Sequence, residues 1–380
     1  MTSDTLPKHA KLARPSAGRF GRNEWAILGA PCGVVEALAA ELFAGLSGRF
    51  ACAWLDADHA AADTPPGMLA AGALLDWTEA GDTHRLLASG KPGPQQFRAL
   101  FNDADLVLVN GNHHAASRQI VLIDPAREAS LRKRREQLTD IRLILLADPS
   151  VPVFDFIEEL LPDPAAVPRL RLDDRAGILH FLEKNMAIPP LYGLVLAGGH
   201  SRRMGRDKGE ICWHGRPQRE HLAELLGKRC EKVFLSVRPD QGLASNWPLL
   251  PDTFTELGPM GAILSAFRAH PDAAWLVAAC DLPLLDEATL DFLIKNRRPG
   301  AFATSFKSPE DGWPEPLVAI WEPKSYARAL SFLAQGYSCP RKVLINSDVC
   351  ILDAPSPEAL SNVNTPHELE QLRHLFKLPL

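Results

Sequence analysis

Two series of short apolar segments, each alternating with helical patterns, constrain the fold of this chain more than any other feature. The first series of strand-like segments covers residues 24–29, 51–56, 105–110, 119–124 and 141–148, with helical patterns at 34–46 and 127–138. The second series covers residues 192–197, 232–237, 274–279, 301–306 and 317–321. Short apolar strands separated by helices are typical of mainly parallel sheets that are buried on both faces. Each series is therefore predicted to form a three-layer α/β domain.

The two series are separated by Ile188-Pro189-Pro190, which cannot continue a helix and makes a stiff linker. A chain of 380 residues is also too long for one ordinary core. We expect a flexible tail at residues 1–22, a first domain at 23–185, a linker at 186–191 and a second domain at 192–380. The basic run at 132–135 is expected on the solvated face of a helix.

Composition argues against several classes of function. The formal charge of -5 is unfavourable for a nucleic-acid or anionic-membrane binder, because both need a basic surface. The seven cysteines are scattered, without a CxxC pair or a Cys/His cluster, so neither a disulfide framework nor a zinc site is indicated. The first 22 residues lack the apolar stretch of a secretory signal, and no apolar run approaches the roughly 18 residues of a spanning helix. We expect a cytoplasmic protein that binds neither nucleic acid nor membrane.

A glycine-rich and basic segment, LAGGHSRRMGRDK at residues 196–208, follows the first strand of the second series. Open α/β sheets bind phosphates at this position. Glycine lets the backbone approach a nucleotide closely, and the arginines and the lysine supply charge for a triphosphate. The predicted nucleotide-binding residues here are Leu196, Ala197, Gly198, Gly199 and Lys208, and the predicted catalytic cations are Lys208, Arg202 and Arg203.

This segment resembles the LAGGxSxRMGxDK signature of the molybdenum cofactor guanylyltransferases, within the wider nucleotidyltransferase superfamily. Three further segments resemble family elements in the same order: Asp252 with GPMGA at 258–262, CDLP at 280–283, and NVNTP at 362–366. The resemblance covers residues 192–380, and four ordered motifs make coincidence improbable. It implies a Rossmann-like fold and transfer of GMP from GTP to the phosphate of molybdopterin, with release of pyrophosphate. Molybdoenzymes or cofactor-insertion proteins would then be partners.

Asp281 is the predicted ligand of Mg²⁺. It follows the apolar strand at 274–279, so its carboxylate is expected at the carboxyl edge of the sheet, where ligands bind. Mg²⁺ typically takes one or two protein carboxylates together with phosphate oxygens. Asp281 is also counted as nucleotide-binding, as is Asp252, which would hold the ribose, orient Lys208 or reach the metal through water.

Base and acceptor specificity depend on fewer residues. Guanylyl-transferring members resemble this chain in having LAGG where cytidylyltransferases usually have LAAG, so Gly198 favours GTP over CTP. Arg238 stands in a stretch that is rich in Asn in family members. On the acceptor side, the resemblance implies Asn362, Asn364, Arg341 and Lys342.

The first series resembles, more weakly, the GTP-binding adaptor that partners the guanylyltransferase. The turn at 29–35 (GAPCGVV) sits where a P-loop would sit, but it lacks the Lys-Ser/Thr pair that contacts phosphate and Mg²⁺. We therefore expect a degenerate adaptor domain that does not hydrolyse GTP, or a structural or docking domain. His59, His113 and His114 would bind a metal or, more commonly for such loop histidines, be solvated or hydrogen-bonded.

Two alternatives to a guanylyltransferase stay open at this point. The same fold would serve a cytidylyl- or sugar-phosphate nucleotidyltransferase with another base or acceptor. A non-catalytic protein of cofactor assembly would also bind nucleotide or cofactor. The presence of both Lys208 and Asp281 favours an enzyme. The acceptor, the oligomeric state and the role of the first domain are not readable from the sequence.

Overall fold

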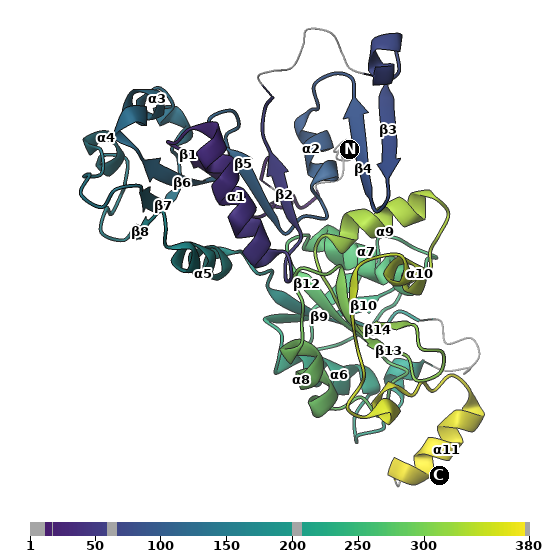
Figure 1. Ribbon diagram of the computed structural model, residues 1–380. Coiled ribbons are helices and arrows are strands. Elements are labelled where there is room, and N and C mark those ends of the chain that lie inside the picture. The colour runs from purple at the N-terminus through teal and green to yellow at the C-terminus, as the bar shows by residue number, and fades with distance from the viewer. Residues whose placement is uncertain (1–11, 17, 59–66, 200–206, 377–380) are drawn as a thin grey trace, which may run out of the picture. The chain divides into compact units, whose positions relative to one another are not determined.

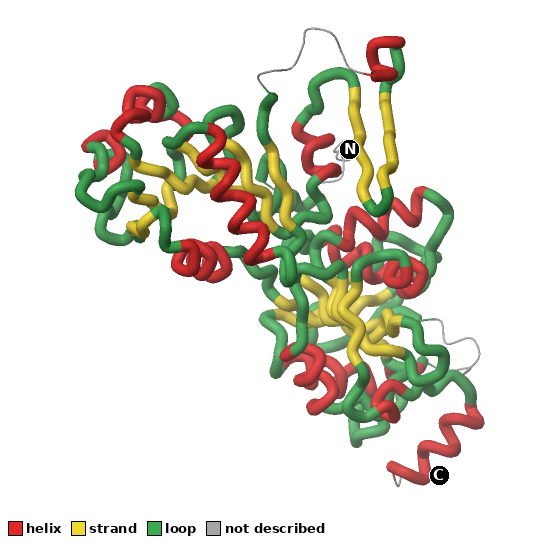
Figure 2. Tube along the Cα trace, in the orientation of Figure 1, coloured by secondary structure: helices red, strands yellow, loops and turns green. Residues whose placement is uncertain are grey.

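The computed structural model describes residues 12–16, 18–58, 67–199 and 207–376. Its contacts divide the chain into two units. The amino-terminal unit is Ala17–Ala187, and the carboxy-terminal unit is Ile188–Leu380 together with Met1–Ser16. Figure 1 labels the elements, and Figure 2 shows helices and strands alternating along both units.

The amino-terminal unit contains a six-stranded sheet in the order β2-β5-β1-β6-β7-β8. Every neighbouring pair in this sheet is parallel. Helices α1 and α5 cover one face, while α2, α3 and α4 pack toward the other, so the unit has three layers. The strands are β1 (Glu24–Leu28), β2 (Cys52–Leu55), β5 (Leu106–Asn110), β6 (Arg118–Ile123), β7 (Ile141–Leu146) and β8 (Arg169–Arg171). The helices are α1 (Cys32–Leu46), α2 (Pro94–Leu100), α3 (Glu128–Arg132), α4 (Asp155–Glu158) and α5 (Arg175–Asn185).

The helix expected at 127–138 is shorter in the structure. α3 ends at Arg132, and single 3-10 turns at Pro125–Arg127 and Arg135–Gln137 flank it. Arg134 of this run is not a solvated helix residue, since its guanidinium donates to the backbone oxygens of Asn112 and Ser130.

Residues 19–21, which were expected in a flexible tail, are anchored. The backbone N–H groups of Arg19, Phe20 and Gly21 donate to Glu24 Oε2 at 2.8, 2.7 and 3.4 Å. The other oxygen of this fully buried carboxylate accepts from Ser117 N at 2.8 Å. A buried carboxylate must be satisfied by donors, and here the segment before β1 supplies them.

A two-stranded hairpin, β3 (Leu75–Ala80) and β4 (Thr83–Ala88), was not predicted from the sequence. Its strands are largely exposed and lack the apolar character of the sheet strands.

The carboxy-terminal unit contains a seven-stranded sheet in the order β11-β10-β9-β12-β14-β13-β15. Strands β11, β10, β9 and β12 are mutually parallel, while β14 runs antiparallel to both β12 and β13. Helices α6 and α8 cover one face, and α7, α9 and α10 cover the other. The strands are β9 (Leu191–Leu196), β10 (Lys232–Val237), β11 (Leu249–Pro251), β12 (Ala274–Ala279), β13 (Ala303–Lys307), β14 (Pro314–Trp321) and β15 (Val349–Leu352). The helices are α6 (Gln218–Gly227), α7 (Pro259–Ala269), α8 (Glu287–Lys295), α9 (Ser325–Ala334), α10 (Pro340–Ile345) and α11 (Pro366–Phe376).

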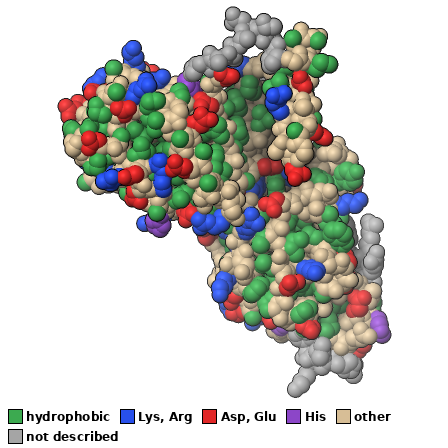
Figure 3. All heavy atoms as spheres, in the orientation of Figure 1, with side chains coloured by type: hydrophobic (Ala, Val, Ile, Leu, Met, Phe, Trp, Pro, Cys, Tyr) green, Lys and Arg blue, Asp and Glu red, His purple; other side chains and the backbone are tan. Residues whose placement is uncertain are grey.

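The predicted α/β class, with two three-layer units and mainly parallel sheets, is confirmed. On the face drawn in Figure 3, basic and acidic side chains are interspersed. Within the described residues, no helix combines the length and the apolar character that crossing a membrane requires.

Candidate active site

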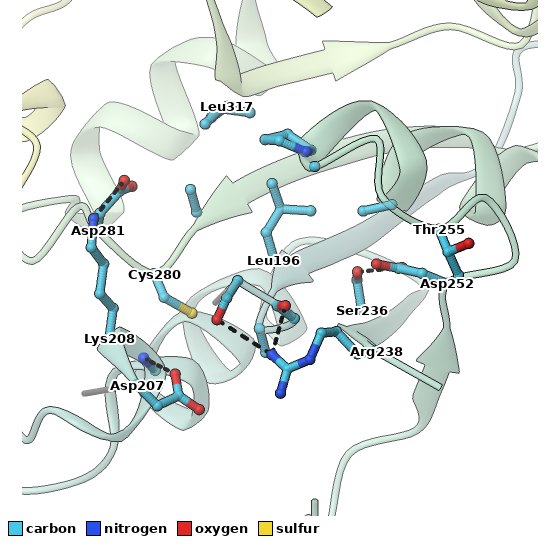
Figure 4. A pocket seen from close by; sticks show the side chains of 18 of the residues that line it. Leu196, Asp207, Lys208, Ser236, Arg238, Asp252, Thr255, Cys280, Asp281 and Leu317 are labelled. Carbon is cyan, nitrogen blue, oxygen red and sulfur yellow. Dashed lines mark hydrogen bonds and ion pairs between the residues drawn. The ribbon is translucent and has the colours of Figure 1, made fainter. Parts of the chain in front are cut away.

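A cavity of about 490 Å³ opens at the carboxyl ends of β9, β10 and β12. These strands are parallel neighbours, so the residues that follow them meet at one edge of the sheet. The predicted residues that line the cavity are Leu196, Ala197, Gly198, Gly199, Lys208, Asp252 and Asp281. Figure 4 shows Lys208 and Asp281 on one side of this cavity and Asp252 with Ser236 on the other.

Lys208 lies between two side chains from distant parts of the chain. Its Nζ donates to Asn364 Oδ1 at 2.6 Å and lies 3.4 Å from Asp281 Oδ2. The side chains of Lys208 and Asp281 are 18% and 19% exposed. The Asp207 carboxylate accepts from Gly209 N at 2.8 Å and so starts the short 3-10 turn, Lys208–Glu210, that carries the lysine.

The segment before α11 is fixed beside Asp281. Val363 N donates to the backbone oxygen of Asp281 at 2.8 Å. Glu368 Oε2 accepts from Asn364 N at 2.6 Å and from Thr365 N at 3.1 Å, while Glu368 N donates to Thr365 Oγ1 at 3.3 Å. This reciprocal arrangement between Thr365 and Glu368 is a capping box. The hydrogen bond from the backbone N–H of Asn364 is the main cause that lowers the pKa of Glu368. The cap thereby holds Asn364 in reach of Lys208.

Asp281 has the features of a metal ligand. Its Oδ1 is buried and makes no hydrogen bond, although Oδ2 faces Lys208. A buried carboxylate oxygen without a donor is costly unless a cation or another partner binds it. Within the part of the chain that the structure describes, no three His, Cys, Asp or Glu side chains converge as a metal cage. The donor set therefore fits Mg²⁺ held by one carboxylate and by phosphate oxygens, rather than a metal enclosed by protein.

Asp252 occupies a different position from Asp281. Ser236 Oγ donates to Asp252 Oδ1 at 2.7 Å, and Asp252 N donates to Val237 O at 2.8 Å. Burial raises the pKa of Asp252 to about 6, and the hydrogen bond from Ser236 opposes that rise. The side-chain partners that hold Lys208 include Asn364 and Asp281, and the three roles expected for Asp252 stay predictions.

The glycine-rich loop is braced by two side chains from the segment after β10. Arg238 Nη1 donates to the backbone oxygen of Gly198 at 3.0 Å and to that of Gly199 at 3.5 Å. Gln241 Nε2 donates to Ala197 O at 3.1 Å. Because N–H and C=O point in opposite directions across a trans peptide, a Gly198 oxygen turned toward Arg238 turns the Gly199 N–H away from it. Arg238, which departs from the Asn-rich pattern of the resemblance, therefore orients the loop.

Known proteins are similar in sequence to the part of the chain that carries this site. The profile of the MobA-like NTP transferase domain matches residues 193–349. A molybdenum cofactor guanylyltransferase of Pseudomonas putida is 30% identical over 193 residues, which are 48% of this chain and 98% of that protein. The chain belongs to the molybdenum cofactor guanylyltransferase family. The carboxy-terminal unit carries the family's nucleotidyltransferase domain, as predicted.

A molybdenum cofactor biosynthesis bifunctional protein of Synechocystis sp. is 37% identical over 186 residues. The match covers 48% of this chain and 54% of that protein, so the chain spans about half of this relative's length. Among solved structures, a MobB protein homologue from Bacillus stearothermophilus is 19% identical, with a TM-score of 0.31, over 43% of this chain and 97% of the other. At that level of similarity, the adaptor-like character of the amino-terminal unit stays a prediction.

The other residues predicted for this member of the guanylyltransferase family are found in different places. Arg202 and Arg203 lie outside the described residues. On the acceptor side, Asn362 adjoins Val363, which binds the backbone of Asp281. Arg341 does not present a free charge, because it pairs with Asp311 Oδ2 at 2.7 Å and Glu315 Oε2 at 3.0 Å.

Lys342 is placed beside an aromatic ring, since its Nζ lies 5.3 Å from the centroid of the Tyr337 ring. Neither Arg341 nor Lys342 lines the cavity. Sequence reasoning did not assign roles to Ser236, Gln241 or Glu368. Only Glu368 left a local signal, the Thr-x-x-Glu spacing of a capping box.

In the amino-terminal unit, the strand-turn-helix context of a P-loop is present. β1 ends at Leu28, Gly29 has φ 94°, and α1 begins at Cys32. A cavity of about 150 Å³ adjoins this turn. His113 Nε2 lies 3.2 Å from Cys32 Sγ and 3.9 Å from Asp56 Oδ1, whereas the buried His114 Nε2 has no hydrogen-bond partner. His59 lies outside the described residues, and the described histidines form no metal cluster.

Proposed function

We propose that this protein transfers GMP from GTP to the phosphate of molybdopterin, releasing pyrophosphate, with Mg²⁺ as the metal. Membership of the guanylyltransferase family supports the reaction type. The observation that carries the proposal is the convergence of Lys208, Asn364 and Asp281 at the carboxyl edge of the sheet. There, Asp281 Oδ1 is buried and makes no hydrogen bond. This arrangement provides one cation and one metal-binding carboxylate for two phosphate groups that must approach each other.

The reaction is an in-line displacement at the α-phosphorus of GTP. An oxygen of the acceptor phosphate forms the new P–O bond, and the bond to the pyrophosphate oxygen breaks. Lys208 binds a non-bridging oxygen of the phosphate that reacts. Its positive charge neutralises the negative charge that develops while one P–O bond forms and the other breaks. Mg²⁺, when bound at Asp281, supplies further charge neutralisation between the two anions. Arg202 and Arg203 belong to the same proposal as cations for the triphosphate.

The glycine-rich loop supports GTP over CTP. A Cβ added at Gly198 would lie 3.1 Å from Arg238 N and 3.3 Å from Val237 C, so the loop packs tightly against the end of β10. An alanine here would push the loop away from β10, and we propose that the close approach of Gly198 favours GTP. Asp252, on that side of the cavity, would hold the ribose.

A pyrophosphate-release assay with each of the four nucleoside triphosphates, with and without molybdopterin, tests the proposal. Release with GTP that depends on both Mg²⁺ and molybdopterin is the expected result. Release with CTP alone would favour a cytidylyltransferase, and release with a sugar phosphate in place of molybdopterin would favour another acceptor class. Binding of GTP without any transfer would favour a non-catalytic assembly protein.

The amino-terminal unit is proposed to be a degenerate adaptor-like domain without nucleotide hydrolysis. The turn at 29–35 lacks the lysine and hydroxyl that hold phosphate and Mg²⁺. Calorimetry on residues 23–185 and on residues 189–380 separates the two units, and we expect GTP with Mg²⁺ to bind only the second. Tight binding by the first would contradict this division. A cytoplasmic location, and molybdoenzymes or cofactor-insertion proteins as partners, belong to the same proposal.

A further inference from the structure

The first turn of α6 contacts both loops that carry the proposed catalytic residues. Gln218 is fully buried, and its Nε2 donates to the backbone oxygen of Leu282, one residue past the proposed metal ligand, at 3.0 Å. Arg219, the next residue, faces the short turn Lys208–Glu210. A Cβ added at Gly209 of that turn would lie 3.5 Å from Arg219 Cβ, so the turn packs directly on the stem of the arginine. One end of one helix therefore supports the metal loop and the lysine turn together.

Arg219 is a buried cation with an incomplete set of partners. Its side chain is 10% exposed, and its Nε and Nη1 atoms are buried and make no hydrogen bond. Nη1 lies 3.7 Å from Asp207 Oδ2, and Nη2 lies 3.5 Å from Glu210 Oε1. Because the Glu210 side chain is largely exposed, Asp207 is the stronger of these two charged partners. A buried guanidinium with so few hydrogen bonds costs stability, and an apolar side chain would fill the same space at least as well. The charge of Arg219 is therefore expected to serve the site.

Asp207 connects Arg219 to Lys208. Its Oδ1 accepts from Gly209 N at 2.8 Å, while its other oxygen, Oδ2, faces Arg219. The bond to Gly209 starts the turn, so the direction of the Asp207 side chain sets where Lys208 leaves the backbone. Figure 4 shows Asp207 beside the backbone end of Lys208 and Asp281 at its ammonium end. A change in the contact between Arg219 and Asp207 would thus be passed to the lysine.

The charges of this region also act together on the buried thiol of Cys280. Burial is the main cause that raises the pKa of Cys280. The charges of Asp281 and Asp207 add to this rise, whereas those of Arg219 and Lys208 oppose it. Arg219 is therefore near the metal loop, although it does not line the cavity. A phosphate in the cavity would engage Lys208 and leave the pair of Arg219 with Asp207 in place.

We propose that Arg219 is a positioning residue for the nucleotide: by holding Asp207, it fixes the turn that aims the Lys208 ammonium group at the triphosphate. This inference rests on the proposed function and adds to it a residue that does not touch the substrate. Because Arg219 acts through Lys208, its contribution should vanish once the lysine has lost its charge. A residue that only stabilises α6 would contribute equally with and without that charge.

Variants of the full-length protein test this role: Arg219→Met, Arg219→Lys, Lys208→Met, the double variant of Arg219→Met with Lys208→Met, and the control Arg229→Met. Arg229 is a similarly buried arginine, with a side chain 8% exposed, but it pairs with Glu287 and Asp291 of α8, and none of these three residues lines the cavity. Calorimetry gives the Kd for GTP with Mg²⁺, pyrophosphate release with molybdopterin gives kcat/KM for GTP, and thermal unfolding gives Tm.

Arg219→Met is expected to raise the Kd for GTP and to lower kcat/KM for GTP about 10- to 100-fold, the range found when an outer partner of a binding group is lost. Arg219→Lys keeps a charge near Asp207 and is expected to lose less. In the Lys208→Met background, the further effect of Arg219→Met should be less than about twofold, because the two residues act as one unit. Arg229→Met is expected to lower Tm, since it leaves two carboxylates without their partner, while kcat/KM stays within about twofold.

The inference would be overturned by an Arg219→Met protein with unchanged kcat/KM, or by equal losses from this change in the wild-type and Lys208→Met backgrounds. A Lys variant no better than the Met variant, or an Arg229→Met protein as impaired in kcat/KM as Arg219→Met, would overturn it as well. Where Arg219→Met does not fold, Arg219→Gln carries the same comparison. A wild-type protein that binds no GTP would contradict the proposed function itself, whereas the other outcomes would leave that function intact.

Discussion

The substitution Asp281→Asn tests the metal site most directly. The two side chains have nearly the same shape, and the Asn oxygen can still accept from Lys208 Nζ, which lies 3.4 Å from Asp281 Oδ2. Removing the charge leaves the buried Oδ1 position without a ligand atom for Mg²⁺. We expect kcat to fall about 100-fold or more, as when one transition-state contact is lost.

A second effect of Asp281→Asn is visible without turnover. In the wild type, GTP with Mg²⁺ at 100 times its Kd is expected to stabilise the folded state by about 2.7 kcal/mol. For a unit of this size, 1 kcal/mol corresponds to a Tm shift of about 2–4 °C, so the ligand raises Tm by about 5–11 °C. Thermal melts with and without GTP and Mg²⁺ measure this gain, and most of it is expected to disappear in the variant.

Asp286→Asn is the matched control for Asp281→Asn. Asp286 is five residues away and caps α8, with its Oδ1 accepting from Thr289 N at 2.8 Å. Asn is as good an N-cap as Asp, so this variant is expected to keep both turnover and the ligand-induced Tm gain. An Asp281→Asn protein that behaves like the control in both assays would refute the assignment of Asp281 as the metal ligand.

Three further predictions concern the other side chains of the cavity. Lys208→Met keeps the apolar stem and removes the charge, so kcat/KM for GTP should fall about 100-fold or more. The control Lys228→Met breaks an exposed ion pair with Glu287 and should change kcat/KM little. Gly198→Ala places a Cβ 3.1 Å from Arg238 N, so steady-state assays should show a higher KM for GTP and a smaller preference over CTP; an unchanged ratio would remove Gly198 as the determinant of base choice. Burial raises the pKa of Asp252 from 3.8 to about 6. Between about pH 4 and pH 6 the Asp252 carboxyl is therefore deprotonated in the unfolded chain but still protonated in the folded one, so the free energy of unfolding falls as the pH rises. Urea unfolding at about pH 4 and pH 7 should show this loss of stability, and Asp252→Asn should reduce it.

The parts of the site that follow parallel strands were predictable from the sequence. Gly198 and Asp281 each lie just beyond an apolar run, and parallel strands bring such positions to one edge whatever the details of packing. Lys208 and Asp252 were predicted from the family resemblance instead, and all four residues line one cavity.

The parts that depend on long-range pairing were not predictable in the same way. Strand β14 was expected only from residue 317, and nothing in its composition reveals that it is antiparallel or that it begins at Pro314. The contacts of Arg341 with Asp311 and Glu315 depend on this long-range pairing, and its acceptor-side role stays a prediction. Strands β11 and β15 are three and four residues long, too short to produce a periodic signal.

The contacts of Lys208 with Asn364 and with Asp281 differ in a way that suits a phosphate-binding lysine. The hydrogen bond from Lys208 Nζ to Asn364 Oδ1 is short, at 2.6 Å. The distance from Lys208 Nζ to Asp281 Oδ2 is 3.4 Å, which is longer than a charge-assisted hydrogen bond of about 2.7–2.9 Å. At that separation the gross attraction is about 5 kcal/mol for an effective dielectric constant of about 20, and the cost of desolvating both groups offsets part of it.

Under the proposed function, an arriving phosphate oxygen would replace Asp281 as the anionic partner of Lys208 while Asn364 keeps the ammonium group in place. Asp281 would then offer both oxygens to Mg²⁺. The capping box of α11 and the Val363–Asp281 backbone contact fix the Asn364 segment, which fits such an exchange. A lysine that changes anionic partners needs one neutral partner that does not move.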